Sequence, residues 1–422
     1  MKAIQFSTIV VICFLFSCTK TTETVTKEIV QIPIYQHSTE KEAEAGLIQS
    51  SPKKLTSFGN IYIYKQYLLI NERGQGVHIF DNSDPNSPQK ISFMNVPGNF
   101  DMAIKNDILY VDSYDDLLSL DISSINNIQL LNRTDDVFPQ KHPSRFGIIV
   151  GYKDTTIIRT SQNQTGNFLN LGRSDDFALA ETTFQNSNLA NQNNVGTGGS
   201  FSRFTLANDH LFTIDNQTLK AFNVSNNQAP IEVKREIINQ GGIIETVFPY
   251  GDNLFIGSTV GVFIYDISDP ASFSFTSNFT HARACDPVYV EDDVAFVTLR
   301  SNTSNNCWGV NNQLDILDVA DVANPKLTNT YPMQNPHGVG VDGSLLFICE
   351  ADAGLKIYSL TKTFTSNNDL STVNISLLKH EKSIFAYDVI PDNGNLIVVG
   401  EQQLLQYDYT DPNNITLRSI LN

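Results

Sequence analysis

Residues 261–270 read Gly261-Val-Phe-Ile-Tyr-Asp-Ile-Ser-Asp-Pro270, and residues 76–85 read Gly76-Val-His-Ile-Phe-Asp-Asn-Ser-Asp-Pro85. In both stretches an alternating apolar strand ends in aspartate, and an Asp-Pro pair follows. Asp caps its own backbone, while Pro fixes φ and cannot continue a strand ladder. The pairs Asp84-Pro85, Asp269-Pro270 and Asp411-Pro412 are therefore expected to form turns and not to bind metal.

This unit is an internal repeat. Weaker copies end at Asp121, Asn223, Asp318, Ser359 and Asp408, and successive copies lie 40 to 52 residues apart, except for one gap of 102. Each unit contains four apolar segments of strand length separated by turn residues, the period of a four-stranded propeller blade. The sequence predicts an all-β fold, a single β-propeller over residues 58–422 with seven blades; six or eight blades are the alternatives.

The repeats resemble those of the LVIVD-repeat family, in particular the bacterial lipoproteins that carry it. Ile108-Leu109-Tyr110-Val111, the Asp266 turn and Leu355-Lys356-Ile357-Tyr358 match the family pattern, whereas Ser359 and Asn223 depart from it. The resemblance covers Phe58 to Asn422. It implies the propeller architecture and says little about chemistry, because a fold does not fix a function.

The N-terminus has the order of a secretory signal. Lys2 precedes an apolar stretch from Ile4 to Phe16, too short to span a bilayer, and Ser17-Cys18 follows. A cysteine after a small residue resembles the lipobox of bacterial lipoproteins, which implies a signal peptide over residues 1–17 and a lipid on Cys18; a plain signal peptide is the alternative. Residues 18–57 are expected to be a flexible tether, with Ile29 to Tyr35 as a strand that docks.

The chain without its signal carries 27 basic and 45 acidic residues, a formal charge of −18. This balance disfavours nucleic acid and anionic lipid as partners, because both require a basic surface. Aromatic residues make up 10% of the chain and apolar residues 41%, enough for a globular core. The acidity is therefore expected on a folded surface.

Three cysteines remain once Cys13 leaves with the signal and Cys18 takes a lipid. A disulfide between Cys285 and Cys307 is expected to fix the loop Leu299 to Gln313, with Cys349 as the competing partner. This loop holds the single tryptophan, Trp308, which either contacts a partner or covers the loop's own core. The further contact candidates are Arg300, Glu350 and Asp352, although a solvated loop charge is the favoured interpretation of each.

Aligning the second strands of the repeats on one apolar column predicts a polar ring at the channel mouth. The column consists of Leu68, Leu109, Leu211, Leu254, Ala295, Leu346 and Leu396, and the ring of Asn60, Asp101, Arg203, Glu245, Asp286, His337 and Asp388. The ring is either a hydrated plug or a cation or amine site, for which four carboxylates could bind calcium. The metal content stays open, because no metal-binding motif is present.

A long insertion, about residues 136–199, separates the second and third blades and leaves from the channel-mouth face. It is rich in Asn and Gln and ends in Gly196-Thr-Gly-Gly-Ser200, which is expected to be a flexible hinge beside a site. A strand hairpin is expected over Arg145 to Thr160. The glycine run is no phosphate cradle, since no Gly-Lys-Ser/Thr follows.

No catalytic motif is found, and an enzyme is disfavoured but stays open. The leading hypothesis is a monomeric, lipid-anchored binding or scaffold propeller in the bacterial envelope, at the outer membrane or cell surface. It would present one face to a protein, peptide or glycan. The alternative is a calcium-dependent or glycan-active enzyme that uses carboxylates around Asp101, Glu245, Asp286 and Asp388.

Overall fold

The computed structural model describes most of the chain. The described residues are 25–36, 49–56, 58–138, 148–160, 197–200, 202–215, 217–226, 229–238, 242–280, 287–300, 312–365, 370–400 and 403–421. Two compact units are distinguished: Met1–Ile32 with Tyr152–Leu171, and Pro33–Gly151 with Gly172–Asn422. A two-stranded sheet pairs β1 (Val25–Gln36) with β11 (Ile148–Thr160).

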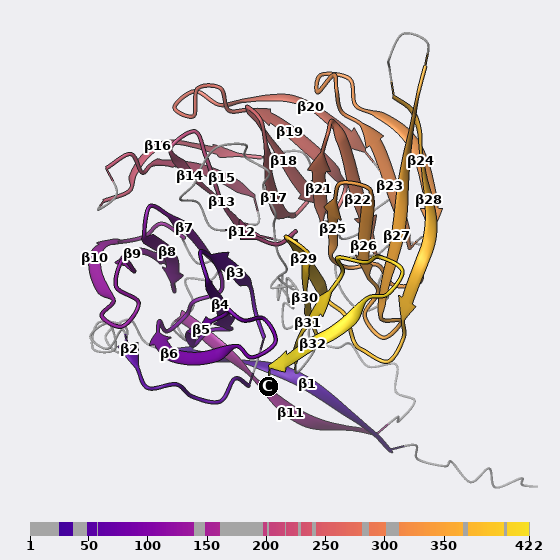
Figure 1. Cartoon of the computed structure of the whole chain (residues 1–422). Coiled ribbons are helices and arrows are strands. Elements are labelled where there is room, and N and C mark those ends of the chain that lie inside the picture. Colours follow the sequence, from indigo (N-terminus) through magenta and orange to yellow (C-terminus); the bar gives the residue numbers. More distant parts are fainter. Residues whose placement is uncertain are drawn as a thin grey trace, which may run out of the picture. The chain divides into compact units, whose positions relative to one another are not determined.

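The larger unit is a seven-bladed β-propeller, as predicted, and each blade is one antiparallel sheet of four consecutive strands (Figure 1). Blade 1 has β3 (Ile61–Tyr64), β4 (Tyr67–Glu72), β5 (Gly76–Asp81) and β6 (Gln89–Asn95). Blade 2 has β7 (Met102–Lys105), β8 (Ile108–Ser113), β9 (Asp116–Asp121) and β10 (Gln129–Thr134). Blade 3 has β13 (Phe204–Ala207), β14 (His210–Ile214), β15 (Thr218–Asn223) and β16 (Ile231–Ile237).

The remaining four blades follow in sequence order. Blade 4 has β17 (Ile244–Tyr250), β18 (Asn253–Ser258), β19 (Gly261–Asp266) and β20 (Ser274–Thr280). Blade 5 has β21 (Val288–Glu291), β22 (Val294–Leu299), β23 (Gln313–Asp318) and β24 (Lys326–Pro332). Blade 6 has β25 (Val339–Asp342), β26 (Leu345–Cys349), β27 (Leu355–Phe364) and β28 (Leu370–Glu381). Blade 7 has β29 (Asp388–Asp392), β30 (Asn395–Val399), β31 (Leu404–Asp408) and β32 (Thr416–Leu421).

The repeat forms the third strand of each blade and the turn after it. In β19 every residue before Asp266 is buried, because neighbouring blades cover both faces of the strand. The Asp266 carboxylate then accepts the backbone N–H of Ser268 at 2.8 Å, and the Asp269 carboxylate accepts that of Ala271 at 3.1 Å. The aspartates are therefore turn residues, as the sequence predicts.

The predicted apolar column is confirmed in every blade. All seven of its residues lie in second strands and are fully buried: Leu68, Leu109, Leu211, Leu254, Ala295, Leu346 and Leu396. The outermost strands differ, since β20 and β24 consist of exposed and half-buried residues only. The core thus lies between the inner three strands of adjacent blades.

The last blade closes the ring against the first. Leu421 and Phe58 belong to one buried cluster. The side-chain amides of Asn82 and Gln406 exchange two hydrogen bonds, of 3.0 and 2.8 Å, and Ser419 donates to the Pro85 carbonyl at 2.7 Å. Hydrogen bonds and apolar packing therefore both join blades 1 and 7.

Polar contacts also join the other blades, at or near the turns between first and second strands; Tyr409 contributes from the turn after a third strand and Tyr289 from within a first strand. These contacts are Tyr64 with Asp107, Lys105 with Asp209, Asn208 with Asp252, Tyr250 with Asp293, Tyr289 with the Val341 carbonyl, and Tyr409 with Asp342. These turns lie at the end of the blades opposite to the channel-mouth face, which carries the ring residues and the turns between second and third strands. At this end of the ring, a polar side-chain contact therefore joins each blade to the next, from blade 1 to blade 7.

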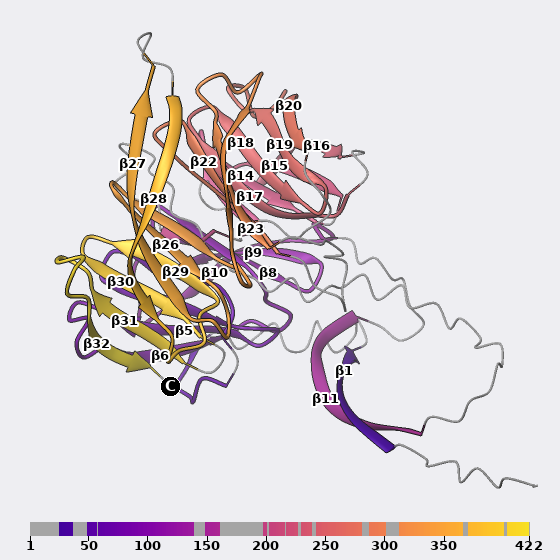
Figure 2. The same ribbon diagram turned by 90° about the vertical axis from the view of Figure 1, so that its right-hand side faces the viewer.

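Blade 6 departs from the other blades where the sequence departs from the repeat. Ser359 stands at the position of the turn aspartate, and β27 does not turn there but runs on to Phe364. Its partner β28 is equally extended, so the hairpin projects past the neighbouring strands (Figure 1 and Figure 2). Asn223, the other departure, still caps its turn by accepting the Ser225 N–H.

Two short strands from outside the repeats extend blade 1. The sheet order is β12-β3-β4-β5-β6-β2, with β12 (Thr197–Gly198) on the axis side and β2 (Gln49–Ser50) on the outer edge. β2 lies within the predicted tether. Farther upstream, the predicted strand Ile29 to Tyr35 lies within β1. The sequence predicts a hairpin at Arg145 to Thr160, but these residues contain a single strand, β11, which pairs with β1.

Strands and their turns account for all the regular structure described. Within the described ranges no helix is long and apolar enough to cross a bilayer. The signal region and Cys18 lie outside these ranges.

Candidate functional site

Six of the seven ring residues are described, and each stands just before a first strand or at its start. Asn60, Asp101, His337 and Asp388 are buried, Glu245 is 9% exposed and Arg203 is half-buried. Asp286 lies outside the described residues. The ring positions are therefore mostly interior. Asp101 and Asp388 contact one stretch of chain that leads into blade 3 and includes Arg203, and Asn60 donates to Asp101.

This segment comprises residues 197–200 and 202–204, and we call it the central segment. Thr197 pairs with Ile63 and Gly198 with Tyr62, which places β12 on the axis side of β3 (Figure 1). A Cβ on Gly198 would lie 2.7 Å from the Tyr62 ring, so only glycine fits there. Thr197 and Gly198 are thus strand residues and not the flexible hinge expected for this part of the run, whereas Gly196 lies outside the described residues.

Asp101 holds the C-terminal part of the central segment. One carboxylate oxygen accepts the Arg203 N–H at 2.5 Å and the Phe204 N–H at 3.2 Å, and the Ser202 hydroxyl lies 3.3 Å away. The other oxygen accepts the Asn60 amide at 2.6 Å. One buried carboxylate therefore joins blades 1, 2 and 3.

Asp388 holds the N-terminal part through a hydroxyl. Ser200 donates to its carboxylate at 3.2 Å and accepts the Val339 N–H at 3.3 Å. A Cβ on Gly338 would overlap the Asp388 carboxylate. Blade 4 contributes as well, since the Val247 N–H donates to the Ser202 carbonyl at 2.9 Å. The central segment thus contacts five blades.

The insertion is held at its other end too. The Phe138 N–H donates to the Asp115 carbonyl at 2.7 Å, and the Phe138 ring stacks on Phe204 with centroids 5.2 Å apart. The buried Lys220 ammonium donates to the Val137 carbonyl. Both ends are therefore fixed near the turns of the channel-mouth face.

Burial shifts the protonation of two carboxyls beneath the central segment. Desolvation raises the pKa of Asp101 to about 6, against the hydrogen bonds from Asn60, Met102 and Arg203 that lower it. Desolvation also raises the pKa of Asp112 to about 7, although Asp112 accepts the Asp101 N–H at 2.9 Å. Carboxyls of this kind change charge near neutral pH.

The contact candidates are placed unequally. Asp352 is exposed in the turn between β26 and β27. Glu350 is fully buried, paired with Lys356, and accepts the Gln334 N–H at 2.6 Å; Arg300 is 8% exposed. The alternative of a solvated loop charge is therefore wrong for Glu350 and Arg300. Trp308 lies outside the described residues.

Cys349 is a free and buried thiol, and burial raises its pKa well above the ordinary range. It therefore pairs with neither of the other two cysteines. Cys285 and Cys307 lie outside the described residues, so the disulfide between them stays a prediction.

The structure shows a contact between the predicted tether and blade 1 that the sequence did not reveal. The buried Glu72 carboxylate meets His78 at 2.9 Å, the Thr56 N–H at 3.0 Å and the Lys53 ammonium at 3.1 Å. Burial by itself raises the pKa of Glu72, but these partners bring it down to about 2. The end of the predicted tether is thus attached to blade 1.

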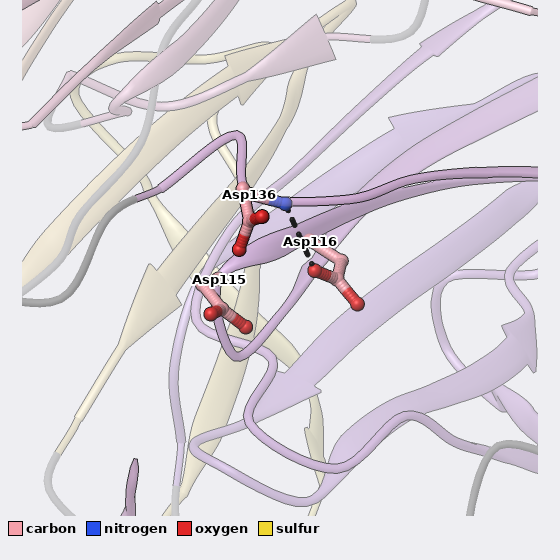
Figure 3. Close-up of side chains that lie close together, drawn as sticks. All are labelled: Asp115, Asp116 and Asp136. Atoms are coloured by element: carbon pink, nitrogen blue, oxygen red, sulfur yellow. Dashed lines mark hydrogen bonds between the residues drawn. The ribbon is translucent and has the colours of Figure 1, made fainter. Parts of the chain in front are cut away.

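A group of acidic side chains lies in blade 2 (Figure 3). Oxygens of Asp115, Asp116 and Asp136 lie within 4.8 Å of one another, and the Asp136 N–H donates to Asp116 at 3.2 Å. Arg133 forms an ion pair with Asp116 and so offsets part of the charge. An acidic group of this size could hold a metal, and no cofactor is identified from it.

Comparison with known proteins supports the fold. No protein-family profile matches the chain, and no curated protein matches it. A protein from Lactobacillus plantarum is 12% identical with a TM-score of 0.53, covering 87% of this chain and 96% of that one. A putative 6-phosphogluconolactonase from Bacteroides fragilis is 10% identical with a TM-score of 0.53, covering 87% and 95%.

A third similar structure is BamB from Moraxella catarrhalis, 9% identical with a TM-score of 0.44 over 82% of both chains. The two structures with a TM-score of 0.53 support the β-propeller fold alone, because their identity to this chain is low. The resemblance to LVIVD repeats stays a prediction.

Proposed function

We propose that this chain is a lipid-anchored protein of the bacterial envelope whose propeller binds a protein, peptide or glycan partner on its channel-mouth face. The lipid on Cys18 holds it at the outer membrane or cell surface, and the propeller acts as a monomer. The proposal combines the Ser17-Cys18 signal, the acidic folded surface and the propeller fold.

One observation carries the binding function in preference to catalysis. Asp101 and Asp388, two carboxylates that a glycan-active or calcium-dependent enzyme would need, accept hydrogen bonds from the chain's own Ser200, Ser202 and Arg203. A general acid or nucleophile must instead reach its substrate. The turns around the ring, where Asp352 is exposed, are then the surface offered to a partner.

The anchor is tested by growing cells with an alkyne-labelled palmitate. The proposal expects labelled protein in the membrane fraction, and Cys18→Ala protein without label. Protease treatment of intact cells then separates a cell-surface position from a periplasmic one. Unlabelled wild-type protein would contradict the anchor.

The partner is tested by pull-down from envelope extracts with wild-type protein and the Trp308→Ala variant. We expect Trp308→Ala to reduce capture of a specific partner by about tenfold. The fold of the variant is checked by its denaturation midpoint. Capture that is equal for the two proteins would contradict the chosen face.

A further inference from the structure

The long hairpin of blade 6 leaves one strand edge open. β26 pairs with β27 only as far as Ser359, and the Leu360 N–H then donates to the Ser344 carbonyl at 2.7 Å. β27 runs on to Phe364, and within the described part of the chain no further strand lies beside it on the β26 side (Figure 2). We call residues 361–364 the open edge.

The backbone of Lys362 points to the open edge. Val373, its partner in β28, has its N–H bonded by the Asn329 side chain and its carbonyl by the Tyr331 hydroxyl, each at 2.8 Å. Residues opposite each other in an antiparallel ladder face either toward or away from each other, so Lys362 turns its N–H and carbonyl away from Val373. No residue that the structure describes accepts from this N–H or donates to this carbonyl.

Blade 5 holds the hairpin in place. The Thr372 hydroxyl donates to the Asn329 side chain at 2.8 Å, and the Lys362 ammonium lies 3.0 Å from the Asp292 carboxylate. Val373 is fully buried against the same blade. A strand that adds to the open edge would therefore meet an ordered backbone, and little binding energy would be lost in ordering it.

Strands of only two residues already cover other edges of this chain. β2 pairs with β6 through Gln49 and Ser50, and β12 pairs with β3 through Thr197 and Gly198. Exposed strand edges bind extended segments through their backbone groups. The open edge of blade 6 is thus long enough to bind one more short strand.

Carboxylates gather at the base of the open edge. Asp342 is exposed in the turn that ends at β26, and Glu291 accepts the N–H of the next residue of that turn at 3.1 Å. Burial and the nearby charge of Asp342 raise the pKa of Asp392. Asp292 adds a fourth carboxylate, and Lys362 is the one cation that these contacts include. This balance favours a cationic occupant.

A second copy of the chain fits the open edge less well. Two copies paired symmetrically about Lys362 would place the two lysines opposite each other, which destabilises a strand pair. Each copy without its signal also carries a formal charge of −18, so the copies repel each other.

We propose that the open edge of blade 6 binds an extended segment of a basic partner protein, which adds a short strand beside residues 361–364 and brings lysine or arginine side chains to Asp342 and Asp292. This surface lies at the end of the blades opposite to the channel-mouth face. It is a second interaction surface, and it does not depend on the function proposed above.

The peptide arm of the test uses fluorescence anisotropy with the whole chain without its signal. The probe is a labelled hexapeptide that alternates lysine with valine. We expect the same peptide with every backbone nitrogen methylated to bind at least about tenfold more weakly, because it keeps its charge but has no N–H to donate. A peptide with glutamate in place of lysine should also bind at least about tenfold more weakly.

The protein arm compares two substitutions at one position. Lys362→Ala and Lys362→Pro both remove the ammonium, but only proline also removes the N–H at the open edge. Lys362→Ala should bind the lysine peptide at least as tightly as wild type, and Lys362→Pro at least about tenfold more weakly than Lys362→Ala. Asp342→Asn should weaken binding about threefold, whereas Asp135→Asn, exposed in blade 2, should bind like wild type.

The denaturation midpoint checks the fold of each variant. If Lys362→Pro fails to fold, the methylated peptide with wild-type protein still decides. Equal binding of the methylated and unmethylated peptides, or of the glutamate and lysine peptides, would overturn the inference. Equal binding by Lys362→Pro and Lys362→Ala would overturn it as well. A wild-type dimer in sedimentation that Lys362→Pro abolishes, without peptide binding, would assign the open edge to a second copy instead.

Discussion

The Ser200 hydroxyl lies 3.2 Å from a carboxylate oxygen of Asp388, a residue 188 positions farther along the chain. This bond ties the end of the insertion to the last blade, and both residues are buried. Ser200→Ala leaves a buried carboxylate with one donor fewer, which should lower the free energy of unfolding by about 1–3 kcal/mol. Denaturant titration measures the loss.

The exposed Ser225, in the turn after β15, serves as the control for this prediction. Ser225→Ala should change the free energy of unfolding by less than about 1 kcal/mol. Equal effects of the two substitutions would mean that the central segment adds nothing particular to the ring.

Gln406 joins the last blade to the first. Its buried amide exchanges two hydrogen bonds with Asn82 and accepts one from Asn395 at 2.7 Å. Gln406→Ala should cost about 2–4 kcal/mol, because several buried polar groups lose their partner at once. Gln89→Ala, at an exposed position, should be nearly neutral. A neutral Gln406→Ala would show that packing alone closes the ring.

Stability should fall as the pH rises through about 6 to 7. Burial raises the pKa of Asp101 to about 6 and that of Asp112 to about 7. The folded chain binds these protons more tightly than the unfolded chain, where Asp titrates near about 4, so the stabilisation is present at low pH and lost above the folded pKa. Asp112→Asn removes one titrating group, so its melting temperature should fall less between pH 5.5 and 8.

The aspartates of the blade turns do not interfere in this range of pH. Hydrogen bonds from Ser83 and Ser268 lower the pKa of Asp81 and Asp266, so their contribution is lost only as the pH falls into the acid range. Asp135→Asn, at an exposed position of blade 2, serves as the control. Identical pH profiles for wild type and Asp112→Asn would contradict the prediction.

The cysteines give a chemical test. Native protein, kept oxidised, should leave Cys349 unalkylated, because its thiol is fully buried. After unfolding without reductant, mass spectrometry should find one alkylated cysteine, Cys349, and one linked pair, Cys285 with Cys307. A linked peptide that contains Cys349 would contradict both the structure and the predicted pairing.

The sequence predicts the ring because its signals are local. The Asp266 turn is capped by a neighbour two residues away, and Leu254 lies in a short apolar run of strand length that is buried on both faces. Seven repeats of such local signals define blade number and register. The missing aspartate at Ser359 is also visible in the sequence, but the length of the hairpin that replaces the turn is not.

The centre of the ring could not be predicted, because its contacts join distant residues. A Gly-Thr-Gly-Gly-Ser run suits a flexible hinge as well as a strand that lies close against another. At Gly198, only the position of the Tyr62 ring shows that the backbone lies close against its neighbour. Glu350 likewise lies in a predicted turn, and its burial depends on Lys356 and the Gln334 backbone. Register placed Asp101 and Asp388 at the ring but not the segment that they bind.

The most direct test of the binding function is cross-linking in living cells. A photoreactive amino acid replaces Asp352, exposed in a turn of the channel-mouth face, or Asp269, exposed in a turn at the opposite end of the blades. The account predicts a discrete cross-linked protein from position 352 and none from position 269. A cross-link from position 269 alone, or none from either position, would contradict it.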